Sequence, residues 1–227
     1  MKLSIVVITN KPKLNGLFLT SLHFGDELIV DKKEQLQTES FAERRNSALK
    51  KAKGEWVLFI DDDEVVSREL AREITEVIKT SKNQGYYLNR KDLFYNQVIR
   101  FGEVSNISIL RLAQKGSGLF ARDVHEVWNI KGKTAKLTNE LYHIKDNFIS
   151  EFVARISLYG PLDADSLNKE GKSFTFFKLL FYPKAKFIQN YIFRRGHLDG
   201  FVGLFLAYLM SVQSLSVRIF QWEKQRS

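Results

Sequence analysis

Four consecutive carboxylates follow a short apolar segment, and they are the side chains of this sequence with the clearest capacity for chemistry. Residues 56–60 are bulky and apolar, which is typical of a strand buried on both faces of a sheet. The carboxylates begin at Asp61 and end at Glu64. Ligands of such sheets bind beyond the carboxyl ends of the strands, so the cluster lies where a ligand site is expected.

The spacing of these acids suggests a bound cation. Along an extended chain, Asp61 and Asp63 point to the same side and Asp62 points to the other. Two converging carboxylates repel each other unless a cation neutralises them, and Mg²⁺ and Mn²⁺ prefer oxygen ligands. The pattern also fits solvated acids in the first turn of a helix, where negative charge is favoured.

Alternating strands and helices are expected to position the cluster. Ser40 and Glu43 have the spacing of a capping box, and Ser67 can cap a later helix. The alternation argues for an α/β layered fold with a mostly parallel sheet. The predicted strands are residues 3–10, 26–31, 56–60, 86–88, 107–112 and 137–142, and the predicted helices are residues 14–22, 40–52 and 67–84.

Composition restricts the class of protein. A chain of 227 residues with 44% hydrophobic and 27% charged residues is typical of a globular protein with a buried core. The absence of cysteine excludes disulfides, thiolate metal sites and cysteine nucleophiles. The net charge of +9 suggests an anionic partner, which could be a nucleic acid, a phosphorylated substrate or a membrane. No signal peptide is expected, because the apolar start is short.

The sequence changes character after about residue 150. Aromatic and basic residues alternate there, and residues 201–220 are almost uncharged over nearly the length that spans a bilayer. Gln213 and several small residues weaken a membrane-spanning interpretation. Three possibilities stay open for this segment: contact with a membrane surface, packing against the core or a partner, and a true span. The predicted domains are residues 1–150 and a helical extension, residues 151–227.

Six segments together carry a family resemblance that covers nearly the whole chain. They are residues 4–10, Asp31, residues 45–49, residues 55–64, residues 124–126 and residues 191–204. In this order they resemble a family 2 glycosyltransferase with the GT-A fold, and more narrowly the small bacterial enzymes that build lipopolysaccharide core and related surface glycans. The resemblance implies a Rossmann-like mixed sheet with helices on both faces, followed by an aromatic-rich helical extension.

The resemblance implies donor-binding roles for five residues. Thr9, Asn10 and Asp31 match the positions that hold the nucleoside of a sugar nucleotide. Arg45 and Asn46 match a helix that approaches the nucleotide or the sugar, although a surface ion pair fits Arg45 as well. The neighbouring Arg44 is expected to face solvent.

The resemblance also assigns the acidic cluster. Asp63 is expected to bind a divalent cation, Mn²⁺ or Mg²⁺, and Asp61 to contact the sugar or ribose, with Asp62 serving either role. Asp61 and His143 are further candidate metal ligands, although a lone histidine is more often structural. The implied donor is a nucleotide-sugar, most simply a UDP-sugar.

Three residues near position 125 are the candidates for acid–base chemistry. Glu126 is the predicted general base, because an inverting transfer needs a carboxylate to take the proton of the acceptor hydroxyl. Asp123 is the second candidate, and His125 could orient the carboxylate or contact phosphate. A structural salt bridge is the alternative for Glu126. One departure from the family pattern is that residues 31–35 lack the Ser/Gly-rich turn that many relatives carry.

These features predict a metal-dependent inverting glycosyltransferase that acts on a lipid-linked or cell-surface glycan. The basic, aromatic extension would hold it at the anionic, cytoplasmic face of the cell membrane as a peripheral protein. A nucleotidyltransferase is one alternative, although the first strand lacks a glycine-rich loop. A non-catalytic basic protein that binds membrane or nucleic acid is another, but no nucleic-acid partner is expected, and no oligomeric state is predicted.

Overall fold

The structure is a computed structural model that describes most of the chain. The described residues are 1–32, 40–80, 82–103, 105, 107–121, 127–145 and 147–226. They form two compact units. The first, called the sheet unit, comprises Met1–Lys91 and Ile107–Ile144, and the second, called the helical unit, comprises Asp92–Asn106 and Lys145–Ser227. The chain therefore passes between the units three times, and a segment from before residue 150 belongs with the helices.

The sheet unit is built on a mixed sheet, as the family resemblance implied, and the alternation of strands and helices predicted its parallel part. The strands β1 (Leu3–Ile8), β2 (Glu27–Asp31) and β3 (Trp56–Asp61) are parallel, with β1 in the middle. The expectation of a mostly parallel sheet is wrong for the other part, because β7 (Ile107–Gln114) runs antiparallel to both β3 and β5 (Gly85–Phe94). The order is β2-β1-β3-β7-β5-β10-β4, with β10 (Thr134–Lys145) and β4 (Glu64–Val66) antiparallel to each other and β6 (Gln97–Val98) paired to β5.

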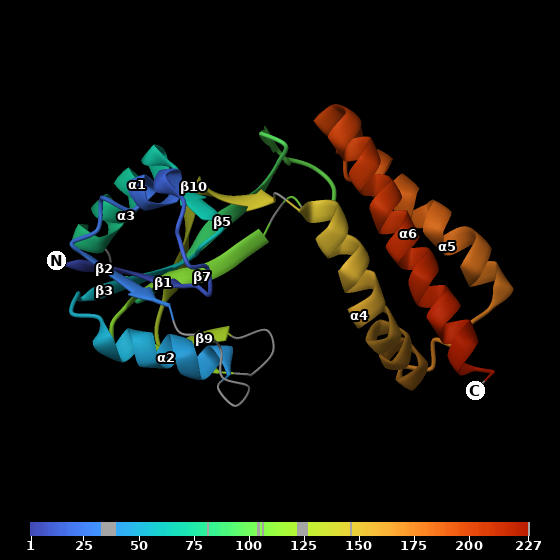
Figure 1. Ribbon diagram of the computed structural model, residues 1–227, viewed down its shortest axis with the longest axis horizontal. Coiled ribbons are helices and arrows are strands. Elements are labelled where there is room, and N and C mark those ends of the chain that lie inside the picture. The colour runs from blue at the N-terminus through green and yellow to red at the C-terminus, as the bar shows by residue number, and fades with distance from the viewer. Residues whose placement is uncertain are drawn as a thin grey trace. The chain divides into compact units, whose positions relative to one another are not determined.

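Helices cover both faces of this sheet (Figure 1). The helices α1 (Gly16–Ser21) and α3 (Arg68–Thr80) lie on one face, and α2 (Phe41–Lys51) lies on the other with the hairpin β8 (Gly118–Ala121) and β9 (Val127–Ile130). Each strand therefore needs apolar side chains on both sides. In β3, Trp56, Leu58 and Ile60 pack with α1 and α3, whereas Val57 and Phe59 pack with α2.

Local signals begin two of these helices as predicted. Ser40 and Glu43 form the capping box of α2, each binding the backbone N–H of the other. Ser67 Oγ accepts a hydrogen bond from the N–H of Leu70 at the start of α3. These caps fix where α2 and α3 begin relative to the strands that precede and follow them.

The acidic cluster lies on a turn that joins two separated strands of the sheet. The strand β3 ends at Asp61, the chain turns at Asp62 and Asp63, and β4 starts at Glu64 beside β10. The extended conformation expected for these residues is wrong at Asp62 and Asp63, because these two residues form the turn between β3 and β4. The register pairs Glu64 with His143, which brings β10 next to the turn.

Three long helices form most of the helical unit (Figure 1). They are α4 (Phe148–Lys169), α5 (Phe176–Ile188) and α6 (Gly200–Lys224), and α6 packs against both of the others. A π-helix, Gln189–Phe193, and a short 3₁₀ helix, Gly196–Asp199, join α5 to α6. Gly203 of α6 lies so close to the carbonyl of Gly196 that a Cβ atom would clash with that oxygen.

Asp199 ties these helices to the segment that precedes β7. Its carboxylate accepts hydrogen bonds from the backbone N–H groups of Arg100 and Phe101, at 3.1 and 2.9 Å, and its side chain is buried. The amide of Gln97 donates to the carbonyl of Asp199. In this unit Ile99 also packs against Leu206 of α6. The Asp-Gly part of residues 191–204 therefore has a structural function within the helical unit.

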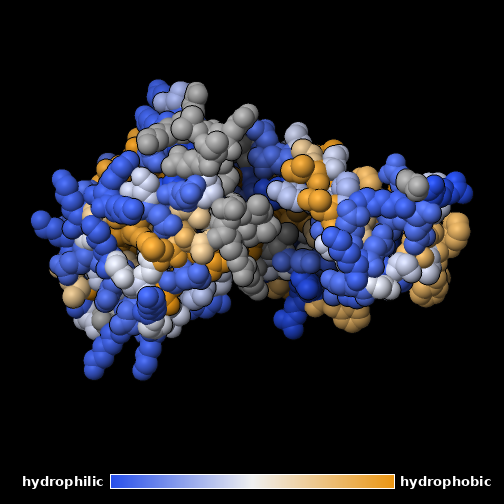
Figure 2. Space-filling view, turned by 90° about the horizontal axis from the view of Figure 1, so that it is seen from below, coloured by the Kyte–Doolittle hydropathy of each residue, from blue (hydrophilic) through white to orange (hydrophobic). Residues whose placement is uncertain are grey.

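Many large apolar side chains of the helical unit are exposed (Figure 2). The most exposed are aromatic: Tyr95, Phe176, Phe177, Phe193 and Phe201. In the described part of the chain, one helical stretch, Gly196–Lys224, is long and apolar enough to cross a membrane by length and composition alone.

Glu73 provides a test of how α3 holds β10. Its carboxylate accepts four hydrogen bonds of 2.8–2.9 Å, from the backbone and side chains of Thr138 and Asn139. Partial burial favours its neutral form, but these hydrogen bonds outweigh that effect and hold the pKa of Glu73 below its ordinary value of 4.5.

We expect Glu73→Gln to lower the free energy of unfolding by about 1–2 kcal/mol at neutral pH. A carboxyl whose pKa is depressed by folding stabilises the protein above its unfolded-state pKa, so this difference should shrink as the pH falls below 4.5. Urea denaturation followed by circular dichroism between pH 7 and pH 3 measures it. The exposed Glu69 on the same helix gives the control, Glu69→Gln. An equal effect of both substitutions, or a difference that does not change with pH, would contradict this interpretation.

Candidate functional site

Arg44 of α2 joins the ends of two parallel strands. Its guanidinium donates to the Asp31 carboxylate at 3.3 Å and to the Asp31 carbonyl at 3.0 Å, beyond β2. It also donates to the carbonyl of Thr9 at 3.1 Å and to Asn10 Oδ1 at 2.8 Å, beyond β1. The side chain is only 2% exposed. The expectation that Arg44 faces solvent is therefore wrong, and the residue is the centre of the predicted nucleoside-binding positions.

Arg45 reaches the end of the third parallel strand. Its Nη2 lies 2.9 Å from Asp61 Oδ1, and its guanidinium lies 5.5 Å from the ring centroids of Phe59 and Phe120. Arg111 of β7 binds the other oxygen of Asp61. Two of the predicted donor-binding residues, Arg45 and Asp61, are thus direct partners, and the alternative of a surface ion pair does not fit because Arg45 is buried.

Asp61 is held in its charged form. Burial raises the pKa of its carboxyl, but Arg111 and Arg45 outweigh burial and lower the pKa to about 2. Because guanidinium groups bind both oxygens, the carboxylate has a fixed orientation. This arrangement suits a residue that orients a polar ligand better than one that supplies a free oxygen to a metal ion.

Asp62 is bound to the end of β1. The hydroxyl of Thr9 donates to Asp62 Oδ2, and Lys11 Nζ lies 2.9 Å from Asp62 Oδ1. The Thr9 hydroxyl also accepts a hydrogen bond from the Lys11 N–H, so the three residues form a closed network. Thr9 is buried, while Lys11 is exposed. The side chains of the consecutive Asp61 and Asp62 therefore have entirely different partners.

Asp63 lies beside His143, as the predicted metal-binding roles require. Asp63 Oδ2 is 3.1 Å from His143 Nε2, and the Asp63 side chain is 42% exposed while the histidine is buried. The backbone carbonyl of Asp63 accepts a hydrogen bond from Ile144, which fixes the turn against β10. Among the described residues, no group of three or more His, Cys, Asp or Glu side chains gathers around a common point.

This donor set fits a divalent cation that shares its coordination with a substrate. Mg²⁺ and Mn²⁺ bound to nucleotides commonly use one or two protein ligands, with phosphate oxygens and water completing the shell. Asp63 and His143 provide such a pair, a carboxylate oxygen and an imidazole nitrogen that lie 3.1 Å apart. The site is therefore compatible with the cation that the sequence suggests.

Glu64 is a buried carboxyl directly behind the turn, and no role for it was predicted. Its Oε2 accepts the backbone N–H of Asp61 at 3.1 Å, and Arg90 lies 3.7 Å from its Oε1. Burial raises the pKa of Glu64, and the charge of Asp61 raises it further. The hydrogen bond to Glu64 thus helps to fix the backbone of Asp61.

Asn46 has a structural task in addition to its predicted contact with the donor. Its amide donates to the carbonyl of Phe120 and accepts from the N–H of Phe120, both at 2.9 Å. This pair attaches β8 to α2. The donor-binding role of Asn46 stays a prediction, and it would have to use an amide that is already hydrogen-bonded.

Sequence reasoning missed Arg111 and Arg90, which lie on β7 and β5. The only signal for Arg111 was a basic residue inside an otherwise apolar predicted strand. The predicted catalytic residues Glu126, Asp123 and His125 lie outside the described residues, as do residues 33–39 of the segment after Asp31. Their roles therefore remain predictions from sequence.

Comparison with known proteins gives a family for this chain. The model of the family described as Glycosyl transferase family 2 matches residues 30–149. A relative from Rhizobium meliloti, named lipopolysaccharide core biosynthesis glycosyltransferase LpsC, is 27% identical over 170 residues, which is 71% of this chain and 63% of the relative. An uncharacterized glycosyltransferase of Rickettsia conorii is 31% identical over 171 residues, 65% of this chain and 58% of that protein. The chain thus matches less than two thirds of the length of either relative.

Among solved structures, those of Staphylococcus aureus TarS are distantly similar to this chain over its whole length. The crystal structure of Staphylococcus aureus TarS 1–349 in complex with UDP has a TM-score of 0.45 and 16% sequence identity. The alignment covers 100% of this chain and 92% of the TarS chain.

Arg44 offers a test of how the strand ends are held. We expect Arg44→Gln to lower the free energy of unfolding by about 3–5 kcal/mol, because it leaves the buried Asp31 carboxylate without its cation. Arg44→Lys should rescue little of this loss, since an ammonium group cannot reach the same set of acceptors in a fixed fork. Chemical denaturation measures both variants.

The control is Arg68→Gln, because Arg68 is exposed at the start of α3. A loss from Arg44→Gln no larger than the loss from Arg68→Gln would show that Arg44 does not hold the strand ends together.

Proposed function

The chain belongs to glycosyl transferase family 2, and on this basis we propose that it transfers a sugar from a nucleotide-sugar donor to a glycan acceptor. The observation that carries the proposal is the network around Arg44 and Arg45. This network joins the ends of three parallel strands through Thr9, Asn10 and Asp31 on one side and Asp61 on the other. These are the positions that the family resemblance assigns to the donor, at the sheet edge where such folds bind ligands.

The nucleoside of a UDP-sugar would bind next to Thr9, Asn10 and Asp31. Carboxylate and amide oxygens accept hydrogen bonds from uracil N–H and ribose hydroxyl groups. Arg44 holds Asn10 and Asp31 in place before any ligand arrives, which reduces the entropy lost on binding. Arg45 and Asp61 would then contact the ribose or the sugar.

Asp63, with His143, would hold a divalent cation, Mn²⁺ or Mg²⁺, beside the donor diphosphate. When bound, such a cation supplies positive charge that stabilises the departing nucleoside diphosphate. Asp61 keeps its negative charge at neutral pH because Arg111 and Arg45 lower its pKa. The ionised Asp61 carboxylate can therefore accept hydrogen bonds from hydroxyl groups of the donor and orient them.

Glu126 would act as the general base in a single displacement. The acceptor hydroxyl oxygen forms a bond to the anomeric carbon as the bond between that carbon and the diphosphate oxygen breaks. The proton passes to the Glu126 carboxylate, the nucleoside diphosphate leaves, and the anomeric configuration inverts. Asp123 is the second candidate for the base, and His125 would orient it.

A lipid-linked or cell-surface glycan is the proposed acceptor class, as in lipopolysaccharide core assembly. The relative from Rhizobium meliloti that is named for lipopolysaccharide core biosynthesis supports this choice. The exposed Phe176 and Phe177, with Lys178 and Lys184 on the same helix, would hold the protein on the cytoplasmic face of an anionic membrane.

The first test is release of nucleoside diphosphate from a panel of UDP-, GDP-, ADP- and dTDP-sugars, with Mn²⁺, Mg²⁺ or chelator. We expect release from a UDP-sugar that needs the cation and falls on the order of 100-fold in Asp63→Ala. Glu126→Gln should lower kcat by roughly 10²–10⁴ while donor binding persists. The exposed Glu69 supplies the control variant, Glu69→Gln.

Binding of each nucleotide is measured in parallel, because turnover also depends on the acceptor. If no nucleotide binds with or without a cation, the proposal fails. Release that is unaffected by both chelator and Asp63→Ala would reject the cation-binding role alone.

The second test concerns the membrane. We expect the double variant Phe176→Ser, Phe177→Ser to bind vesicles of phosphatidylglycerol at least about tenfold more weakly, because two aromatic side chains no longer enter the lipid. Vesicle sedimentation at several salt concentrations measures this. The control is Leu17→Ser, at an exposed apolar residue of the sheet unit. Equal sedimentation of the double variant and the original protein would reject this surface as the membrane contact.

A further inference from the structure

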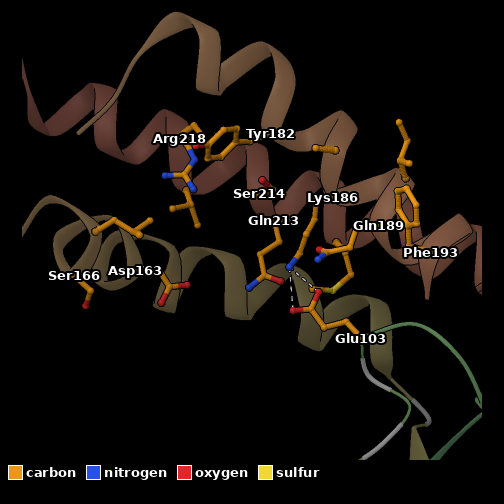
Figure 3. Close-up of a pocket in the computed structure, with 15 residues that line it drawn as sticks. Glu103, Asp163, Ser166, Tyr182, Lys186, Gln189, Phe193, Gln213, Ser214 and Arg218 are labelled. Atoms are coloured by element: carbon orange, nitrogen blue, oxygen red, sulfur yellow. Dashed lines mark hydrogen bonds and ion pairs between the residues drawn. The ribbon is translucent and has the colours of Figure 1, made fainter. Parts of the chain in front are cut away.

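The helical unit contains a cavity of about 920 Å³ that the proposed function does not use (Figure 3). All its lining residues belong to this unit, and they come from α4, α5, α6, the π-helix and Glu103. Its apolar lining includes Leu167, Ile188 and Val217. Cavities of roughly 300–1,000 Å³ with apolar walls and a few polar groups are typical binding sites for small molecules.

One end of the cavity holds the guanidinium group of Arg218, which has no anionic partner among the described residues. Arg218 lies with its guanidinium carbon 5.0 Å from the ring centroid of Tyr182, and it donates to Gln221 Oε1. Its Nε–H is buried and has no hydrogen-bond acceptor among the described residues. A buried donor without a partner is unfavourable, so an anion that reached this group would relieve a cost that the described residues leave.

The remaining charges of the cavity do not neutralise Arg218. Lys186 and Glu103 form their own ion pair at 2.7 Å, marked by dashed lines in Figure 3. Asp163 of α4 also lines the cavity, but among the described residues it makes no ion pair with Arg218. Burial lowers the pKa of the Arg218 guanidinium, which still remains protonated at neutral pH.

We propose that this cavity binds an anionic single-chain amphiphile, with a phosphate or carboxylate head group on Arg218 and the hydrocarbon chain along Leu167, Ile188 and Val217. A guanidinium fork suits both oxyanions, and the apolar wall suits the chain. The combination selects for molecules that carry both features. The proposal does not depend on glycosyl transfer, and it concerns a different set of residues from the membrane surface at Phe176 and Phe177.

Isothermal titration calorimetry below the critical micelle concentration tests the site. The probes are dodecyl phosphate, dodecyl maltoside with the same chain and a neutral head, and inorganic phosphate without a chain. We expect one dodecyl phosphate per protein, with much weaker binding of the other two probes. Arg218→Gln should weaken dodecyl phosphate at least about tenfold and leave dodecyl maltoside unchanged. Ser214→Phe, which places a ring in the cavity, should abolish binding.

The matched control is Arg155→Gln, an equal loss of charge at an exposed position of α4 that does not line the cavity. Equal weakening by Arg218→Gln and Arg155→Gln would mean that net charge alone attracts the probe, which overturns the proposal. Binding that persists in Ser214→Phe, or that occurs only above the critical micelle concentration, also overturns it. Circular dichroism confirms that each variant is folded.

A competition arm separates two sources of such a ligand once the site is established. Vesicles that contain lysophosphatidylglycerol, a single-chain lipid, and displace dodecyl phosphate from the original protein would identify a single-chain lipid of the bilayer as the source. Vesicles that bind without displacing it would indicate a lipid that reaches the cavity as a single molecule.

Discussion

The two adjacent arginines at the start of α2 are the constraint on which the geometry of the sheet edge depends. Neighbouring residues of a helix point about 100° apart, so Arg44 reaches β1 and β2 while Arg45 reaches β3. Both are buried, and a buried guanidinium is stable only where oxygen atoms surround it. The strand ends provide those oxygens. The hydrogen bonds that stabilise the buried charges of Arg44 and Arg45 therefore also fix the positions of the strand ends.

Much of the sheet unit could be predicted because its signals are local. The apolar strands 3–8 and 56–60, the capping box at Ser40 and the helix after Ser67 each depend on a few neighbouring residues, and each was found. The direction of β7 and the path of the acidic turn could not be predicted. They depend on which strands pair across the sheet, and β4 pairs with residues of β10 that lie 75 to 79 positions further along the chain.

The candidate site was predicted as a set of residue types, but its pairings were not. Asp61 and Asp63 were named because they follow an apolar strand, and Asp31 and Arg45 because they match positions of the family resemblance. Asp63 does lie beside the predicted His143. The burial of Arg44 was missed, since adjacent basic residues on a helix look alike in sequence when their partners come from distant strands. Glu64 was passed over for the same reason, because its burial depends on the pairing of β4 with β10.

The discontinuous helical unit has a consequence for how such a chain could have evolved. Asp199 and Leu206 find partners in the segment around Arg100 and Ile99, which the chain contributes long before the helices begin. A gene fusion that added only the last eighty residues to an ancestral sheet would supply buried groups without those partners. Changes in the loop before β7 should therefore be matched by changes in the C-terminal helices that it contacts.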